Sequence, residues 1–193
     1  SKYLKYVKYI DHVEITGAGA TPSEVIIPEK IEGLPVTVIG KSAFAYATMV
    51  SVTIPDIVQE IGTYAFKGCT LLEEVILPDG ITSLQGTFQN CSNLKKAVLP
   101  DSITKIRGKA FAQTALTSFT MSDKVTEIGE GVFENCESIE SVTLSENLTE
   151  IADEMFSGCK SLSEVNLPEK LESIGAGAFK DCSSLSLTEL PTS

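Results

Sequence analysis

The chain contains no tryptophan, a single histidine and few aromatic residues, which make up only 7% of its 193 residues. Hydrophobic residues nevertheless reach 42%, a normal share for a folded protein. Leucine, isoleucine and valine must therefore fill most of any core. This composition argues against bulk disorder and favours a single domain of ordinary size.

Basic residues are also scarce. Fifteen lysines and arginines stand against 26 acidic residues, giving a formal net charge of −11. Because this excess repels a polyanion, we expect no nucleic-acid partner. No apolar run approaches the ~18–20 residues of a bilayer span. The opening Ser1–Lys5 is not followed by the apolar region of a signal peptide, so we expect neither membrane insertion nor a signal peptide in this segment.

A repeat of 22–23 residues runs through the chain. Seven of its eight phenylalanines are Phe44, Phe66, Phe88, Phe111, Phe133, Phe156 and Phe179. Consecutive members are 22 or 23 residues apart, a spacing that chance does not give to a rare residue. Isoleucine or leucine precedes each by four or five residues, and a Leu-x-x-Val-x-Leu-Pro segment such as Leu72–Pro78 follows most of them. Repetition at this period is typical of a solenoid.

Each repeat predicts one short strand. Val75 and Leu77 are two residues apart and so share the buried face, while Ile76 between them points outward. Pro78 cannot continue a hydrogen-bonded ladder and ends the strand. The Gly62–Phe66 stretch is too short for an α-helix and predicts a turn or 3₁₀ segment. Stacked repeats then form a mostly β, right-handed solenoid with parallel strands.

The first 22 residues predict a separate cap. Tyr3–Ile10 and Val13–Thr16 are rich in β-forming residues and predict a strand pair over the first repeat, which would otherwise expose an apolar end. A partial repeat, Ser23–Lys30, nearly duplicates Ser163–Lys170. We therefore predict a β-hairpin cap over residues 1–22 and a solenoid of about seven repeats over residues 23–193.

These motifs resemble the BspA-like leucine-rich repeat. The resemblance rests on Leu-x-x-Val-x-Leu-Pro, on Ile-Gly-x-x-Ala-Phe and on the Gly-Cys or Asn-Cys that follows, and also on the opening Val25–Gly40. It covers the chain from about residue 23 onward. It implies a leucine-rich repeat fold without enzyme activity of its own, in a secreted or cell-surface protein of a host-associated bacterium or sometimes a parasitic protist. It also implies roles in adhesion to host matrix proteins and to other microbes.

All five cysteines follow a repeat phenylalanine by three residues: Cys69, Cys91, Cys136, Cys159 and Cys182. The two repeats without a cysteine are each one residue shorter in the same turn. A zinc site is disfavoured because ligand pairs usually sit two to four residues apart. Disulfides between adjacent repeats remain an alternative, although stacked equivalent side chains point in parallel and the odd count leaves one unpaired. The favoured interpretation is a column of small, buried, reduced thiols.

Residues for catalysis are hard to find. His12 is the only histidine and lies in the predicted cap, where a structural role is the favoured interpretation over a Ser-His-Asp arrangement. The three Gly-x-Gly sequences match no nucleotide-binding fingerprint. We therefore predict no catalytic, cofactor-binding or metal-ligating residues and no enzyme activity.

The outward strand positions are the candidate binding face. They carry mostly threonine and β-branched aliphatic residues, with Glu73 and Glu74 beside Lys95 and Lys96, which predicts cross-strand ion pairs. The predicted face consists of Thr53, Glu73, Ile76, Lys95, Val98, Thr120, Thr143 and Asn166. Ordinary β-propensity explains the same residues without a ligand. Solenoids, however, use such extended surfaces for recognition.

Three functions follow. The first is a binding or adhesion module that recognises a protein or glycoconjugate of a host or microbial surface through this face. The second is a structural spacer with no ligand of its own. The third, an enzyme, would require a polar cluster that interrupts the repeat, and the sequence offers none outside the cap. The first is preferred, in an extracellular or cell-surface location implied by the resemblance.

Overall fold

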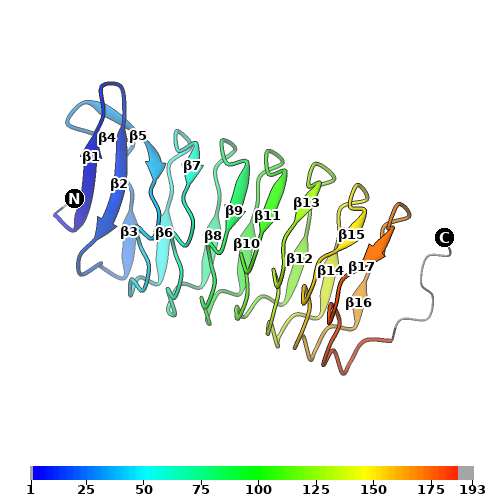
Figure 1. The fold of residues 1–193 in the computed structure, drawn as a ribbon. Coiled ribbons are helices and arrows are strands. Elements are labelled where there is room, and N and C mark those ends of the chain that lie inside the picture. Colours follow the sequence, from blue (N-terminus) through cyan, green and yellow to red (C-terminus); the bar gives the residue numbers. More distant parts are fainter. Residues whose placement is uncertain (1, 187–193) are drawn as a thin grey trace.

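The computed structural model describes residues 2–186, which form strands and turns with no helix. The strands stack into an elongated coil that carries an N-terminal hairpin at one end (Figure 1). Successive repeats lie side by side along the coil in the order of the sequence. Within residues 2–186, no helix is long and apolar enough to cross a membrane. The predicted solenoid of stacked parallel strands is confirmed.

Two rows of strands run along the coil, where the sequence predicts only one. The first row consists of β3 (Glu24–Ile26), β6 (Ser51–Thr53), β8 (Glu74–Ile76), β10 (Lys96–Val98), β12 (Ser118–Thr120), β14 (Ser141–Thr143) and β16 (Glu164–Val165). The second row consists of β5 (Leu34–Ile39), β7 (Glu60–Ile61), β9 (Ser83–Gln85), β11 (Lys105–Arg107), β13 (Glu127–Ile128), β15 (Glu150–Ile151) and β17 (Ser173–Ile174). The prediction of one strand per repeat is therefore wrong in number. Beyond β5, each second strand contains a single isoleucine or leucine, so no pair of apolar residues two positions apart marks it.

A third hydrogen-bonded ladder runs through the turns that carry the phenylalanines. Alternate amides reach the next repeat, as from Phe44 N to the Ala65 carbonyl at 2.7 Å. The amides between them bond three residues back, as from Ala45 N to the Ser42 carbonyl at 3.0 Å. The predicted short turn is thus confirmed, and each phenylalanine amide from Phe44 to Phe156 bonds to the next repeat.

This alternation forces positive φ angles at two places in every repeat, two residues before and two residues after the phenylalanine. The residues are Ser42, Tyr46, Tyr64, Gly68, Gly86, Asn90, Lys109, Gln113, Gly131, Asn135, Glu154, Gly158, Gly177 and Asp181. Left-handed backbone is unfavourable for residues other than glycine. The ladder of hydrogen bonds compensates for that cost in each repeat.

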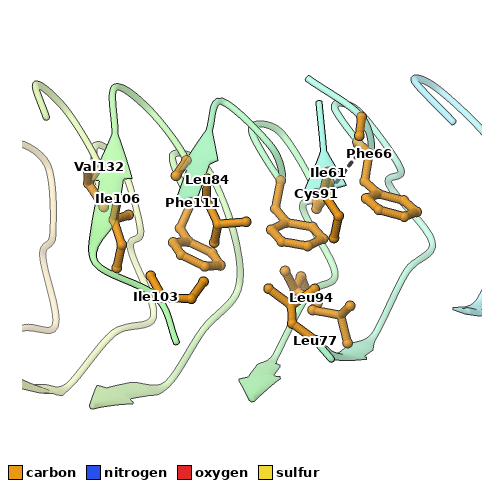
Figure 2. Close-up of a cluster of buried hydrophobic side chains, with 14 of the residues drawn as sticks. Ile61, Phe66, Leu77, Leu84, Cys91, Leu94, Ile103, Ile106, Phe111 and Val132 are labelled. Atoms are coloured by element: carbon orange, nitrogen blue, oxygen red, sulfur yellow. Dashed lines mark hydrogen bonds between the residues drawn. The ribbon is translucent and has the colours of Figure 1, made fainter. Parts of the chain in front are cut away.

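The phenylalanines form a continuous column through the core. Neighbouring rings lie 5.3–6.0 Å apart between centroids and within 16° of parallel. Figure 2 shows Phe66 and Phe111 of this column, with Leu77, Leu94 and Ile103 in the same buried layer. Aromatic pairs of this kind contribute about 0.5–1.5 kcal/mol each beyond the burial of their area. The column therefore ties every repeat to both of its neighbours.

The N-terminal strands form the antiparallel pair that the sequence predicts. β1 (Leu4–Lys8) pairs with β2 (Val13–Ala18), and β2 continues in parallel with β5. A small hairpin between β4 (Lys30–Ile31) and the start of β5 folds back beside them. The turn residue Glu32 accepts hydrogen bonds from Tyr6 Oη at 2.8 Å and Lys8 Nζ at 2.6 Å.

Candidate functional site

The first strand row presents one outward residue per repeat, at or just after the end of each strand, in one line. We call this line the outer row: Ile26, Thr53, Ile76, Val98, Thr120, Thr143 and Asn166. The strand pairings place its members opposite one another, as with Ile26 and Thr53 or Thr120 and Thr143. Six of the eight predicted binding residues therefore lie together in this row. The residue before each of them on the strand is buried or partly buried.

Three members of the outer row are apolar and largely exposed. The exposed fractions are 57% for Ile26, 60% for Ile76 and 40% for Val98. Their inward neighbours Val25 and Val75 are at most 1% exposed. The alternation of a strand explains this contrast, because successive side chains leave opposite faces. The outward positions are therefore free of packing constraints and their side chains are accessible to a ligand.

Charged residues flank the outer row at the start of β8 and β10, where Glu73 and Lys95 precede the strands and Glu74 and Lys96 begin them. Lys96 Nζ lies 2.8 Å from Glu74 Oε1, which confirms one of the two predicted ion pairs. Glu73 and Lys95 are joined instead through their backbones, by a 2.9 Å hydrogen bond from Lys95 N to the Glu73 carbonyl. Both residues are exposed. Exposed ion pairs contribute only about 0–1 kcal/mol, so this cluster shapes the charge of the face more than its stability.

Asn166 differs from the rest of the outer row. It is only half-exposed, because its amide turns back onto the preceding repeat. Its Oδ1 accepts a 2.6 Å hydrogen bond from Leu144 N, and its Nδ2 lies 3.3 Å from the Leu144 carbonyl. The side chain thus supplies ladder contacts that the short β16 does not make. Asn166 lies in line with the other predicted residues, but its amide is occupied by contacts with the backbone of Leu144.

The first row is divided into two sheets, which the repeat pattern does not predict. One sheet has the order β10-β8-β6-β3 and the other β12-β14-β16. Among the described residues, no hydrogen bond joins β10 to β12. The division lies at a hollow of about 540 Å³ lined by both strands. The second row runs unbroken past it through β9, β11 and β13.

The inward residues at this division explain it. At the position where β8 and β14 carry Val75 and Val142, β10 carries Ala97 and β12 carries Phe119. The Phe119 ring packs toward Phe111 and Phe133, with centroids 5.0 and 4.9 Å away. The small Ala97 leaves the other side underfilled. Both substitutions were visible in the sequence as departures from a valine column, and they are the signal that could have found the hollow.

The cysteines form the column that the sequence favours, buried at Cys69, Cys91, Cys136 and Cys159 and half-buried at Cys182. All five are free thiols, and each donates to the phenylalanine carbonyl of the preceding repeat at 3.0–3.1 Å. In one of the short turns, Thr114 occupies the cysteine position and bonds the Phe111 carbonyl at 2.9 Å. Burial raises the pKa of Cys136 to about 11, so this thiol is protonated near neutral pH. These cysteines serve as small packing groups.

The remaining chemistry-bearing groups do not converge. The His12 ring stacks on Tyr9 with centroids 4.6 Å apart, and its Nδ1 lies 2.7 Å from Asp11 Oδ1. Neither contact involves a serine. Across residues 2–186, no group of three or more His, Cys, Asp or Glu side chains is arranged to hold a metal ion.

Sequence comparison identifies the repeat. The BspA type leucine-rich repeat region matches residues 37–111 and 85–193 in six copies. The chain belongs to the BspA-type leucine-rich repeat family. No functionally curated protein matches it.

Solved structures agree with this family membership. The T. pallidum leucine-rich repeat protein shares 35% identity at a TM-score of 0.91, over 96% of this chain and 89% of that one. A leucine-rich repeat protein of Bacteroides ovatus shares 32% identity at a TM-score of 0.93, and the match spans 98% of this chain but only 52% of that one. The pneumococcal vaccine antigen PcpA, at 16% identity and a TM-score of 0.52, shows likeness of fold alone.

Membership of the BspA-type family gives the outer row its context. The chain is a leucine-rich repeat of a kind found in bacterial proteins, and such stacked repeats provide extended surfaces for contact with other proteins. The inward columns are set by packing, so the outward residues of each repeat are where one BspA-type chain can differ from another in what it contacts.

Proposed function

We propose that this chain is a binding module that engages a protein or glycoconjugate on a host or microbial surface through its outer row. The observation that carries the proposal is the exposure of Ile26, Ile76 and Val98, at 40–60%, in one line on a rigid ladder. Apolar side chains exposed side by side are typical of contact surfaces, whereas isolated ones are not.

The rest of the face supports recognition of moderate affinity. Threonine hydroxyls of β6, β12 and β14 continue the line and can donate and accept hydrogen bonds. The described outer row has no tryptophan, tyrosine or arginine, the residues that dominate binding hot spots. Binding energy would therefore be spread over many weak contacts along the coil. Several repeats acting together suit a large surface ligand better than a small molecule.

An extracellular or cell-surface location and an adhesive role form part of the same proposal. They are supported by membership of the BspA-type family and by its bacterial relatives. A scaffold of stacked repeats also suits the alternative role of a spacer, which predicts that the outer row has no ligand.

The test measures saturable binding of the full chain to immobilised fibronectin, laminin, collagen and whole bacterial cells. The variant Thr120→Lys/Thr143→Lys places two long charged side chains in the outer row. We expect it to weaken binding at least about tenfold, since buried lysine ammonium groups are costly in an interface. The matched control is Thr82→Lys/Thr126→Lys, two exposed threonines ahead of β9 and β13 in the second row.

The outcomes separate the candidates. Binding lost in the first variant and kept in the control supports the outer row. Equal binding by both variants overturns the outer row as the contact surface. Absence of saturable binding to every probe overturns the binding module and favours the spacer.

A further inference from the structure

The hollow between β10 and β12 is an interruption in an otherwise hydrogen-bonded surface. On its two sides the ladder is complete. Leu77 N reaches the Val98 carbonyl at 3.0 Å on one side, and Met121 N reaches the Thr143 carbonyl at 2.9 Å on the other. The equivalent bond from Leu99 to Thr120 is missing. The bond from Ile54 to Ile76 is missing too, but β6 and β8 still pair at Ser51 and Glu74, whereas β10 and β12 do not pair. Backbone amides and carbonyls that would pair β10 with β12 in a continuous sheet therefore border the hollow instead.

Such groups demand partners. A strand directs its amides and carbonyls alternately to its two sides, so β10, paired on one side with β8, has a second set directed toward β12. The same holds for β12, which pairs only with β14. Edge strands of this kind are templates for another chain. Here the edges of β10 and β12 face the same hollow. The backbone amides and carbonyls along each edge are spaced as in any β-strand, so they match those of an extended peptide.

The side chains of the hollow match the same ligand. Ala97 leaves room at its base, and Leu99 beside it is half-buried. Val98 and Thr120 form the rim on either side, as members of the outer row. The one aromatic residue of the lining, Phe119, is only 4% exposed and packs against Phe111 and Phe133, so it offers no platform on which a sugar ring could stack. Main-chain recognition with an apolar side chain entering the hollow is the better fit.

Charge narrows the class of peptide. Lys95 and Lys96 line the hollow together with a single acidic residue, Asp101, so its charged lining is net positive in a chain whose net charge is −11. Lys96 is paired with Glu74, but Lys95 makes no ion pair among the described residues. A second hollow of about 370 Å³, between β6 and β8, has Asp56 and Glu74 in its lining and no lysine or arginine. The β10–β12 hollow is thus the one suited to an acidic segment.

The geometry points to the hollow between β10 and β12 as the site where this chain binds an extended, acidic peptide segment of a protein partner. The segment hydrogen-bonds to the free edges of the two strands, seats an apolar side chain over Ala97 and pairs its carboxylates with Lys95 and Lys96. This inference rests on the proposed function, because it specifies the partner and the centre of the outer row.

The first test needs no ligand. Amide hydrogen exchange of the free chain reports which amides lack partners. We expect residues 96–98 and 118–120 to retain a set of fast-exchanging amides, whereas every amide of 141–143 in the doubly paired β14 exchanges slowly. Equal protection in all three strands would overturn the open edge and with it the proposal.

The second test uses a display library of linear nine-residue peptides, selected on the full chain. Selected peptides should alternate apolar residues with aspartate or glutamate and should slow exchange at residues 96–98 and 118–120. Lys95→Glu/Lys96→Glu should weaken their binding at least about tenfold, as expected when attraction becomes repulsion. Lys160→Glu/Lys180→Glu is the matched control, with the same change in net charge at exposed lysines beyond the strand face.

The remaining outcomes are decisive. If no acidic peptide is selected, or if both lysine pairs behave alike, the peptide site is overturned. Chondroitin sulfate bound through Lys95 and Lys96 without protection of the amides would replace the peptide by an anionic polysaccharide. If Thr143→Lys abolishes binding to surface ligands while the Lys95/Lys96 variant does not, the outer row survives and only the hollow fails. If neither Thr143→Lys nor the Lys95/Lys96 variant changes binding to surface ligands, the proposed function is overturned as well.

Discussion

The two sheets of the first strand row carry different chemistry at the same repeat position. In β3, β6, β8 and β10 the outward residues are mainly aliphatic, with Ile26, Ile76 and Val98 exposed. In β12 and β14 they are threonines, followed by an asparagine after β16. The inward positions of the strands away from the division are valines, because each must fit the same neighbours, and only Ala97 and Phe119 at the division depart from them. The difference teaches that packing dictates one face of each strand and leaves the other free to vary.

Phe119 is the inward residue that most sharply separates the two sheets, and its removal should have the largest effect. The ring is 4% exposed and contacts Phe111 and Phe133. Phe119→Ala should lower the free energy of unfolding by about 3–5 kcal/mol, since a ring-sized cavity remains. Urea unfolding followed by circular dichroism gives this value. Val142→Ala, at the same position in β14, should lower the free energy of unfolding by a smaller amount. A larger loss for Val142→Ala than for Phe119→Ala would contradict the core role of Phe119.

The second row should be the connection that spans the division, and Gly129 tests it. A Cβ at Gly129 would collide with the backbone of Arg107 and Gly108 in the neighbouring repeat. Gly129→Ala should therefore cost about 1–3 kcal/mol, the usual range for overpacking. Gly108→Ala is the matched control, because a Cβ there meets only the Glu130 carbonyl, at 3.6 Å. Thermal unfolding should show a lower Tm for the first variant only, and equal Tm values would contradict the close approach.

One residue of the outer row, Asn166, contributes to the stability of the fold, whereas exposed members such as Ile76 do not. Asn166→Ala leaves Leu144 N without its 2.6 Å partner and should cost about 1–2 kcal/mol. Ile76→Ala, at a side chain that is 60% exposed, should change stability by less than about 0.5 kcal/mol. Chemical denaturation of both variants checks the contrast. Equal losses would mean that the outward positions of the two sheets are structurally alike.

The smallest effect concerns pH. Arg107 and Lys105 on β11 hold the pKa of Glu127 on β13 below its usual value of 4.5. A carboxyl whose pKa is lower in the folded state stabilises it above the unfolded pKa, and that contribution disappears as pH falls below about 4.5 toward the folded value. Glu127→Gln should therefore narrow the stability difference between pH 7 and pH 3 slightly. The free energy of unfolding of both proteins, measured at pH 7 and pH 3, checks this expectation. An equal difference in the two proteins would show that the ion pairs of Glu127 do not stabilise the fold.

Most of the fold could be predicted because it follows from side chains. The spacing of Phe44 to Phe179 marks the coil, and the alternation at Val75, Ile76 and Leu77 separates the buried from the exposed face. The strand pair in the first 22 residues followed from local β-propensity. The outer row was found by the same alternation, and the structure places Thr53, Ile76, Val98, Thr120 and Thr143 on solvent-exposed positions.

The parts that were missed depend on backbone contacts between repeats. The second strand row and the turn ladder are built from amides and carbonyls that every residue possesses, so no residue type announces them. The turn ladder left one trace in the recurrence of glycine two residues from the phenylalanine. At Gly68 a Cβ would collide with the ring of Tyr46 from the preceding repeat. The sequence does not show that Gly68 and Tyr46 lie in contact, because the two residues meet only when the repeats stack.

The sequence by itself determined the period, the residues that line the core and the row that faces solvent, because hydrophobic burial and strand alternation act on each residue where it stands. Only the tertiary structure decided which neighbouring strands are joined by hydrogen bonds and which are not. The division between β10 and β12 depends on the size of Ala97 relative to Phe119, 22 residues later in the chain, and on the direction in which that ring packs. Such a fit between repeats exists only once they are stacked.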